Sequence, residues 1–224
     1  MHCKYKSIAS FRDVKKYLRK WKILTLNNKF NIQNQIELAR MEEKISKQNA
    51  LSLWSSDKFN DMKAGTFKTL AKIHKILFDE IYYFAGKLRD VNISKGNFRF
   101  ASALYLNEAV SSVEKMPQST FDEIIAKYIE MNIVHPFREG NGRSMRLWLD
   151  HILKIELKQV IDWSRIDKNE YLQAMERSPI NDSEIKKLLA SALTDKIDDR
   201  EIFMKGLDAS YFYENYFAYR SEDL

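Results

Sequence analysis

Twelve consecutive residues of this chain carry side chains suited to phosphate chemistry. They run from His135 to Arg146 and read HPFREGNGRSMR. His135 can accept a proton near neutral pH, and Glu139 offers a carboxylate of the kind that holds magnesium together with phosphate oxygens. Arg143 and Arg146 lie three residues apart, and guanidinium groups match phosphate oxygens two at a time. The segment therefore predicts a site for a phosphate-containing ligand.

The same string predicts a helix, a sharp loop and a second helix. Pro136 ends the helix before it, and Gly140 and Gly142 flank Asn141 just before a periodic apolar run. The run has the spacing of one buried helix face and consists of Met145, Trp148, Leu149, Ile152 and Leu153. A helix N-terminus preceded by glycines has unpaired N–H groups and room for an anion. Phosphate is the expected ligand.

Each of these residues also has an ordinary structural interpretation. Arg146 and Asp150 have the i,i+4 spacing of a surface ion pair, and an isolated His135 is more often a partner in a local hydrogen bond than a catalyst. The complete pattern, with base, carboxylate, glycines and arginines in order, favours the functional interpretation.

Two further helices are expected to position the string. Apolar spacing predicts one helix over Thr66–Phe84, ended by Gly86, with His74 packed in its apolar face. It predicts another over Phe121–Val134, which delivers the histidine of the string. Asn132, one turn earlier, is a candidate to face the same site.

One segment, residues 92–100 (NISKGNFRF), departs from the helical pattern. Its alternating residues surround a Gly-Asn pair, which is typical of a short hairpin with a primed turn. On the pattern alone an ordinary connecting loop is as good an interpretation.

At this point the residues resemble a known family. HPFREGNGRSMR fills every position of the HPFx(D/E)GNGRxxR signature of Fic-domain proteins, most of which are adenylyltransferases, and the resemblance covers most of residues 50–217. The resemblance implies an all-α Fic fold, a helical bundle with a short β-hairpin flap over the active site. It implies transfer of AMP from ATP to a Tyr, Ser or Thr hydroxyl of a target protein, with ATP and Mg2+ as cofactors.

The resemblance also implies roles for individual residues. His135 is the general base and Glu139 the magnesium ligand. The nucleotide-binding residues, with Asn132 added as above, are Lys95, Gly96, Asn97 and Phe98 of the flap and Gly140, Asn141, Gly142, Arg143 and Arg146 of the loop and following helix. The flap aligns the target through main-chain contacts, so target side chains leave little trace in this sequence.

A second motif near the C-terminus resembles the inhibitory (S/T)xxxE(G/N) sequence of self-restrained Fic proteins. It reads Ser210-Tyr211-Phe212-Tyr213-Glu214-Asn215, and its Ser210 and Glu214 share a helix face. In the family the glutamate pairs with the second arginine of the motif, here Arg146, and excludes the γ-phosphate. A packed C-terminal helix with an exposed glutamate is the alternative. Tyr211 is a candidate for automodification when the helix detaches.

Composition predicts one main domain. The chain has 224 residues, 45% of them hydrophobic, with six glycines and three prolines, enough for a sizeable core. The single cysteine, Cys3, excludes an intramolecular disulfide, and no apolar run is long enough to span a bilayer. We expect a cytoplasmic protein with a basic extension over 1–40, a Fic domain over 41–206 and an inhibitory helix and tail over 207–224.

The net charge of +6 is concentrated at the N-terminus, since residues 1–33 hold nine Lys or Arg against one acid. Nucleic-acid or membrane binding by this segment is possible in principle, but a solvated extension is favoured because no nucleic-acid motif accompanies the charges. The expected partner is a protein substrate, for which family analogy alone suggests a type II topoisomerase. A homo-oligomer that braces the inhibitory helix is a further expectation.

Three other functions stay open at this stage. A Fic relative that transfers phosphate usually lacks the Gly-Asn-Gly arrangement, which argues against that chemistry here. Transfer of another nucleotide or of phosphocholine is compatible with the motif. A nucleic-acid-binding protein with a relic Fic fold is the least favoured, because the catalytic string is intact.

Overall fold

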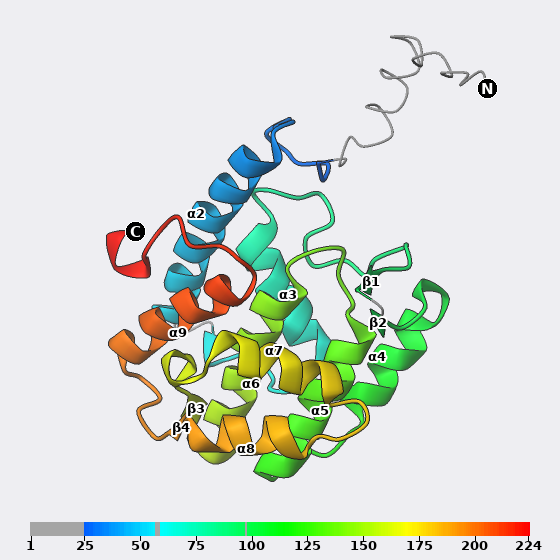
Figure 1. Ribbon diagram of the computed structural model, residues 1–224, viewed down its shortest axis with the longest axis vertical. Helices are drawn as coiled ribbons and strands as arrows, with labels where there is room; N and C mark the ends of the chain where they lie inside the picture. Colours follow the sequence, from blue (N-terminus) through cyan, green and yellow to red (C-terminus); the bar gives the residue numbers. More distant parts are fainter. Residues whose placement is uncertain (1–24, 57–58, 97) are drawn as a thin grey trace, which may run out of the picture.

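The computed structural model describes residues 25–56, 59–96 and 98–224, and most of them form helices packed around a central one (Figure 1). The helices in chain order are α2 (Gln35–Trp54), α3 (Phe67–Phe78), α4 (Leu106–Glu114), α5 (Phe121–Val134), α6 (Asn141–Leu157), α7 (Lys168–Arg177), α8 (Ser183–Ser191) and α9 (Arg200–Tyr213). Short 3-10 turns occupy η2 (Ala103–Tyr105), η3 (Trp163–Arg165) and η4 (Ser221–Asp223). Among these residues the strands form two pairs, β1 (Ser94–Lys95) with β2 (Phe98–Arg99) and β3 (Val160–Ile161) with β4 (Leu193–Thr194).

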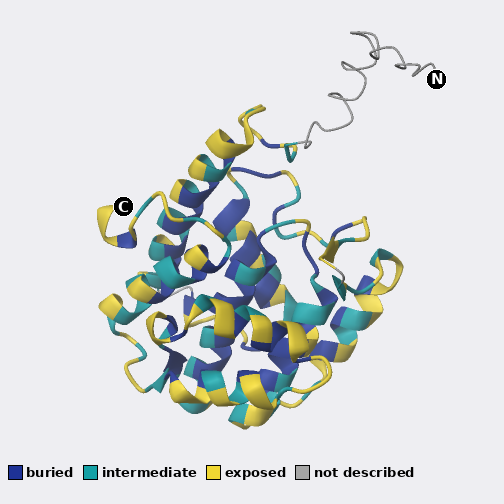
Figure 2. Ribbon diagram, in the orientation of Figure 1, coloured by how far each residue is buried: buried dark blue, intermediate teal, exposed yellow. Residues whose placement is uncertain are grey.

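Helix α6 is the centre of the core. It packs against α5 and α3, and its predicted inward face is fully buried, since Met145, Trp148, Leu149, Ile152 and Leu153 are each 0% exposed. His151 and Leu147 on its other faces are buried as well. Figure 2 shows the buried residues gathered in the middle of the bundle and the exposed ones at its rim. A helix buried on all sides is a rigid support for whatever stands at its first turn.

Helix α5 has the predicted bounds, Phe121–Val134. It begins with a capping box, in which the Thr120 hydroxyl accepts the Glu123 amide and the Glu123 carboxylate accepts the Thr120 amide. It ends at the residue before His135, as Pro136 requires. The segment from His135 to Arg146 therefore starts directly from a helix end.

Helix α3 is shorter than the sequence predicts. It stops at Phe78 rather than Phe84, although Ile81 and Tyr82 beyond it are buried. The apolar spacing continues because the turns after the helix are buried too, and these are held by tertiary contacts. Tyr82 donates to Glu42 of α2, and the Gly86 amide donates to the ring of His74. Gly86, with φ 74°, ends these turns rather than the helix.

The predicted hairpin is present. Ser94 pairs with Arg99 and Lys95 with Phe98 in antiparallel register. Asn97, which the sequence places in the turn, lies outside the described residues. The hairpin and the first turn of α6 line the same pocket, where a flap over the loop is expected.

The C-terminal segment lies along α2. Helix α9 and the turn η4 both contact α2, and Figure 1 shows the red C-terminal segment beside the blue helix. Both α2 and α9 extend across the expected boundaries at 40/41 and 206/207. In the part of the chain that the structure describes, no helix is both long and apolar enough to cross a membrane. Residues 1–24 of the basic extension lie outside that part.

Candidate active site

His135 stands at the end of α5 in an unusual backbone conformation. Its φ and ψ of 49° and 65° are left-handed, which costs a residue with a Cβ about 1–2 kcal/mol. The ring Nδ1 lies 3.2 Å from the carbonyl oxygen of Asn132. Because a carbonyl only accepts, Nδ1 carries the proton and Nε2 is left with its lone pair. This is the tautomer that a general base requires.

The surroundings of His135 keep it neutral. Its ring stacks on Phe100, with centroids 3.7 Å apart. Burial lowers its pKa from 6.5 to about 4, and the charges of Lys95 and Arg89 act in the same direction, whereas the Asn132 carbonyl and Glu214 oppose them. His135 is therefore ready to accept a proton at neutral pH.

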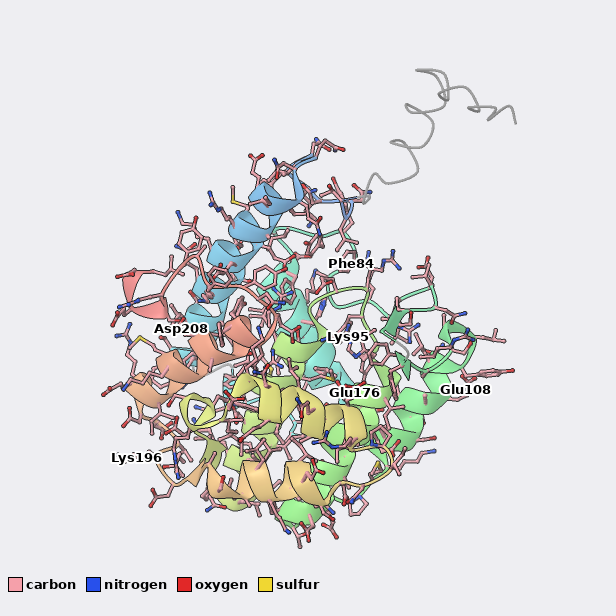
Figure 3. All side chains as sticks on the ribbon, viewed as in Figure 1. Phe84, Lys95, Glu108, Glu176, Lys196 and Asp208 are labelled. Atoms are coloured by element: carbon pink, nitrogen blue, oxygen red, sulfur yellow. The ribbon has the colours of Figure 1, made fainter. Side chains whose placement is uncertain are left out.

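A pocket of about 630 Å³ opens in front of His135. Its walls come from the flap, the loop before α6, the first turns of α6, and α7, with Glu214 at one side. Lys95 of the flap and Glu176 of α7, both labelled in Figure 3, line this pocket. Its volume is in the range of pockets that hold small molecules.

The loop between His135 and α6 is fixed by its own side chains. Both polar atoms of the Asn141 side chain bond the backbone of Phe137, at 2.8 Å each. Gly140 is left-handed with φ 76°, and a Cβ on it would lie 2.4 Å from the Phe78 ring. His74 is fully buried below, stacks on Phe137 and bonds the Glu139 carbonyl at 2.8 Å. The loop is thus rigid before any ligand binds.

The Asn141 contacts bear on its expected role. Its side chain, 3% exposed, is engaged with Phe137, so what it can offer a phosphate is its backbone amide. This amide is in the first turn of α6, where N–H groups have no helical acceptor.

Glu139 and Arg143 face each other across one turn. The Glu139 Oε1 accepts the Gly140 amide at 2.9 Å and Arg143 Nη2 at 3.2 Å. Arg143 is 1% exposed and also donates to Glu42 of α2 at 2.5 Å. Tyr216 covers its guanidinium at 4.5 Å. Arg143 therefore lines the pocket while it forms a buried ion pair with Glu42.

Arg146 is held by the C-terminal helix. It donates to the Ser210 hydroxyl at 2.7 Å, to the Ser210 carbonyl at 2.8 Å and to the Glu214 carboxylate at 3.0 Å. The rings of Tyr171 and Tyr213 lie 5.8 and 5.4 Å from its guanidinium carbon. Burial acts to raise the pKa of Glu214, but the charges of Arg146, Lys95 and Arg143 outweigh it and hold that pKa below its usual value. Glu214 is ionised in this contact.

Gly142 makes the approach of Glu214 possible. A Cβ on Gly142 would lie 2.3 Å from Glu214 Oε1, a distance that no Cβ tolerates. The carboxylate therefore lies against the first turn of α6, the helix end that the sequence marks as an anion site.

The structure brings most of the predicted site residues together. Lys95, Gly96, Phe98 and Asn132 line the pocket with the loop residues. Tyr211 does not: it is 1% exposed, and its hydroxyl donates to Ser46 of α2 at 2.7 Å.

Other residues of the site lack a sequence signal. Phe100 and Arg89 precede the string by more than thirty residues, and Tyr171, Met175 and Glu176 come from a helix with no motif. Glu42, the partner of Arg143, lies about a hundred residues earlier. The one sequence signal for any of these residues is the alternating pattern over residues 92–100, which includes Phe100.

Known proteins are similar in sequence to this chain. Residues 65–153 match the Fic/DOC family. The protein adenylyltransferase VbhT of Bartonella schoenbuchensis is 29% identical over 176 residues, which is 72% of this chain and 35% of VbhT. The probable protein adenylyltransferase Fic of Escherichia coli is 26% identical over 187 residues, 79% of this chain and 90% of that protein. The chain thus corresponds to about a third of the length of VbhT.

Solved structures share the fold. The BepC protein of Bartonella tribocorum with bound AMPPNP superposes with a TM-score of 0.67 at 19% identity, over 76% of this chain and 92% of that one. The ADP-bound Fic domain of a putative cell filamentation protein from Bartonella quintana gives 0.64 at 19% identity, over 80% and 93%. The helical bundle with its hairpin flap is the Fic fold, and within it residues 65–153 match the Fic/DOC family model.

Proposed function

We propose that this chain transfers AMP from ATP to a hydroxyl group of another protein. The observation that carries the proposal is His135 Nε2, which is unprotonated beside a pocket whose floor is the amide-rich start of α6. The names of the relatives, protein adenylyltransferases, support the reaction, and the nucleotides named with the similar structures support the ligand.

The reaction balances with the groups present. The target hydroxyl oxygen attacks the α-phosphorus of ATP, the bond to the bridging oxygen breaks, and pyrophosphate leaves. His135 Nε2 takes the hydroxyl proton. The amides of the α6 first turn and Arg146 hold the phosphates in line, so catalysis comes chiefly from positioning and electrostatics.

Glu139 fits magnesium that arrives with the nucleotide. Among the described residues no group of three or more His, Cys, Asp or Glu could hold a metal by itself. Magnesium typically needs only one or two protein carboxylates when phosphates supply further ligands. The Glu139 side chain is 44% exposed toward the pocket and is held by Arg143. When bound, the ion would offset the negative charge of the phosphates.

The position of the label in ATP tests the reaction. Glu214→Gly protein is incubated with a protein mixture and ATP labelled at either the α- or the γ-phosphorus. We expect protein bands that carry the α-label and not the γ-label, with loss of the signal in a Glu214→Gly/His135→Ala variant that still binds ATP. Labelling by the γ-phosphorus instead would identify phosphate transfer, and full labelling by the His135→Ala variant would overturn the role of that residue. Mass spectrometry of the labelled bands decides whether a type II topoisomerase is among them.

We infer in addition that Glu214 restrains the reaction. Its carboxylate pairs with Arg146 at 3.0 Å and lies against Gly142, in the space where a terminal phosphate would meet the same guanidinium. Two anions compete for one cation, so ATP binds in a pose unsuited to transfer. Glu214→Gln keeps the volume and removes the charge. We expect its transfer rate to lie between those of the wild type and Glu214→Gly; a Gln variant as slow as the wild type would show that the ion pair is not what restrains the site.

Tyr211 stays a candidate for automodification only when α9 detaches, because its hydroxyl is buried on Ser46. Peptide mass mapping of the Glu214→Gly protein after reaction with ATP tests this. An added AMP on Tyr211 supports it, and an unmodified Tyr211 in a chain modified elsewhere contradicts it.

A further inference from the structure

A single buried arginine joins the flap to the backbone of His135. Arg89 is 4% exposed, and all the partners of its guanidinium in the described part of the chain are main-chain carbonyls. Nη1 donates to Val91 at 2.6 Å and Nη2 to Ala101 at 2.5 Å. These two residues stand just before and just after the hairpin. One guanidinium therefore holds both ends of the flap.

The same guanidinium holds the helix end that carries the base. Nε donates to the His135 carbonyl at 2.8 Å and Nη2 to the Val134 carbonyl at 3.1 Å. The Arg89 amide also donates to the Pro136 carbonyl at 2.9 Å. A planar group with five donors in a fixed fork can satisfy such a set, whereas a lysine ammonium cannot match its geometry.

Each of the last four carbonyls of α5 accepts a hydrogen bond from a named donor. A helix leaves its last four carbonyls without helical partners. Met131 accepts the His135 amide at 3.0 Å, and Asn132 accepts the His135 ring at 3.2 Å. Ile133 accepts the Ala101 amide at 3.0 Å, and the fourth carbonyl is the one bound by Arg89. Two of the four are thus tied to the flap or to the arginine that holds it.

We propose that Arg89 is a positioning residue, which fixes the flap relative to His135 so that a target hydroxyl aligned on the flap meets the base. The proposal rests on the proposed function, in which the flap aligns the target. Stacking of Phe100 on the His135 ring adds a side-chain contact between the same two parts. The phosphate-binding amides belong to α6 and do not touch Arg89, so its loss should disturb alignment more than nucleotide binding.

The test compares Arg89→Lys and Arg89→Gln with a variant that loses a different buried cation. All the variants are made in the Glu214→Gly protein. Lys127 of α5 is 2% exposed and donates to the carbonyls of Glu114 and Met116 and to the side chain of Gln118, away from the pocket. Lys127→Gln therefore controls for loss of a buried cation as such.

We expect Arg89→Lys to lower kcat for AMP transfer by about tenfold or more while KM for ATP changes by less than about twofold. Lys127→Gln should lower the melting temperature and leave both constants near those of the Glu214→Gly protein. An Arg89→Lys variant with undiminished kcat, or an equal loss of kcat in Lys127→Gln, would overturn the proposal.

A second readout is independent of activity. The amide of Ala101, bonded to Ile133, should exchange its hydrogen faster in Arg89→Lys and at an unchanged rate in Lys127→Gln. If the Glu214→Gly protein transfers no AMP, the proposed function fails, and the exchange rate at Ala101 still decides the role of Arg89. Unchanged exchange there would overturn it.

Discussion

At the scale of single residues, the site combines an expected set of side chains with a set of neighbours that gives them their properties. His135 is suited to the proposed role of base because one ring nitrogen is bonded to the Asn132 carbonyl and because burial disfavours its charged form. Ser210 fixes the guanidinium of Arg146 while leaving it at the pocket wall, where it pairs with Glu214. The identity of these residues is visible in the sequence, and their protonation and orientation depend on the fold.

The pKa of His135 gives a direct prediction. Because its pKa is lowered to about 4, its imidazole should stay neutral as the pH is reduced from 7 to about 5. Proton NMR can follow it, since the chain has four histidines and a His135→Asn variant assigns the signal. A His135 signal that titrates near pH 6.5 would mean that the ring is solvated and that the fold does not lower its pKa.

At the scale of elements, α9 is held in place by the segment that follows it. Lys47 of α2 is 1% exposed and contacts Glu43 at 3.1 Å, Asp208 of α9 at 2.9 Å and the Tyr219 carbonyl at 2.5 Å. Ser221 donates to the same Asp208 carboxylate. Asp208 is labelled in Figure 3, between α2 and α9. The restraint that we propose for Glu214 would therefore depend on how firmly α2 holds α9.

Removal of this anchor should release the restraint. Lys47→Met keeps the side-chain volume but leaves Glu43 and Asp208 without their shared cation, a change that typically costs about 3–5 kcal/mol for a buried pair. We expect a lower melting temperature and a higher rate of AMP transfer than in the wild type. Lys154→Ala removes another Lys–Asp pair, with Asp198 just before α9, and should leave the rate unchanged. A Lys47→Met protein as slow as the wild type would show that the anchor does not control Glu214.

At the scale of the whole molecule, buried titratable groups couple stability to pH. Burial lowers the pKa of His74 to about 3, so the unfolded chain, with a pKa near 6.5, binds more protons between these values. The stability due to neutral His74 is complete above pH 6.5 and is lost as the pH falls toward 3. His135 acts in the same sense, and Asp150, whose pKa burial raises to about 7, acts in the opposite one.

A variant isolates the His74 contribution. In His74→Asn the unfolding free energy should fall less steeply between pH 6 and 4 than in the wild type, with a difference of up to about 1.4 kcal/mol per pH unit. Denaturant unfolding at several pH values measures the two slopes. Equal slopes would mean that folding does not lower the pKa of His74.

The sequence predicted the fold well where a local rule decides it. Pro136 ended α5 at Val134, and the apolar spacing gave the buried face of α6. The alternation over residues 92–100 left a hairpin and an ordinary loop equally open, and only the family resemblance favoured the hairpin that the structure has. The prediction from sequence was wrong about the end of α3 because buried turns keep the apolar spacing of a helix. The left-handed conformation of His135 and the partners Arg89 and Glu42 could not be predicted, because they arise from contacts between segments far apart in the chain.

We propose that the loop from His135 to Arg146 transfers AMP and that Glu214 restrains this transfer. The most direct measurement is the initial rate of α-label transfer to protein by the wild type and by Glu214→Gly at the same ATP and magnesium concentrations. We predict a rate at least about tenfold higher for the variant, as expected when a competing carboxylate no longer occupies the position of a phosphate on Arg146. Equal rates for the two proteins would contradict the restraint by Glu214, and no transfer by either would contradict the AMP-transfer reaction.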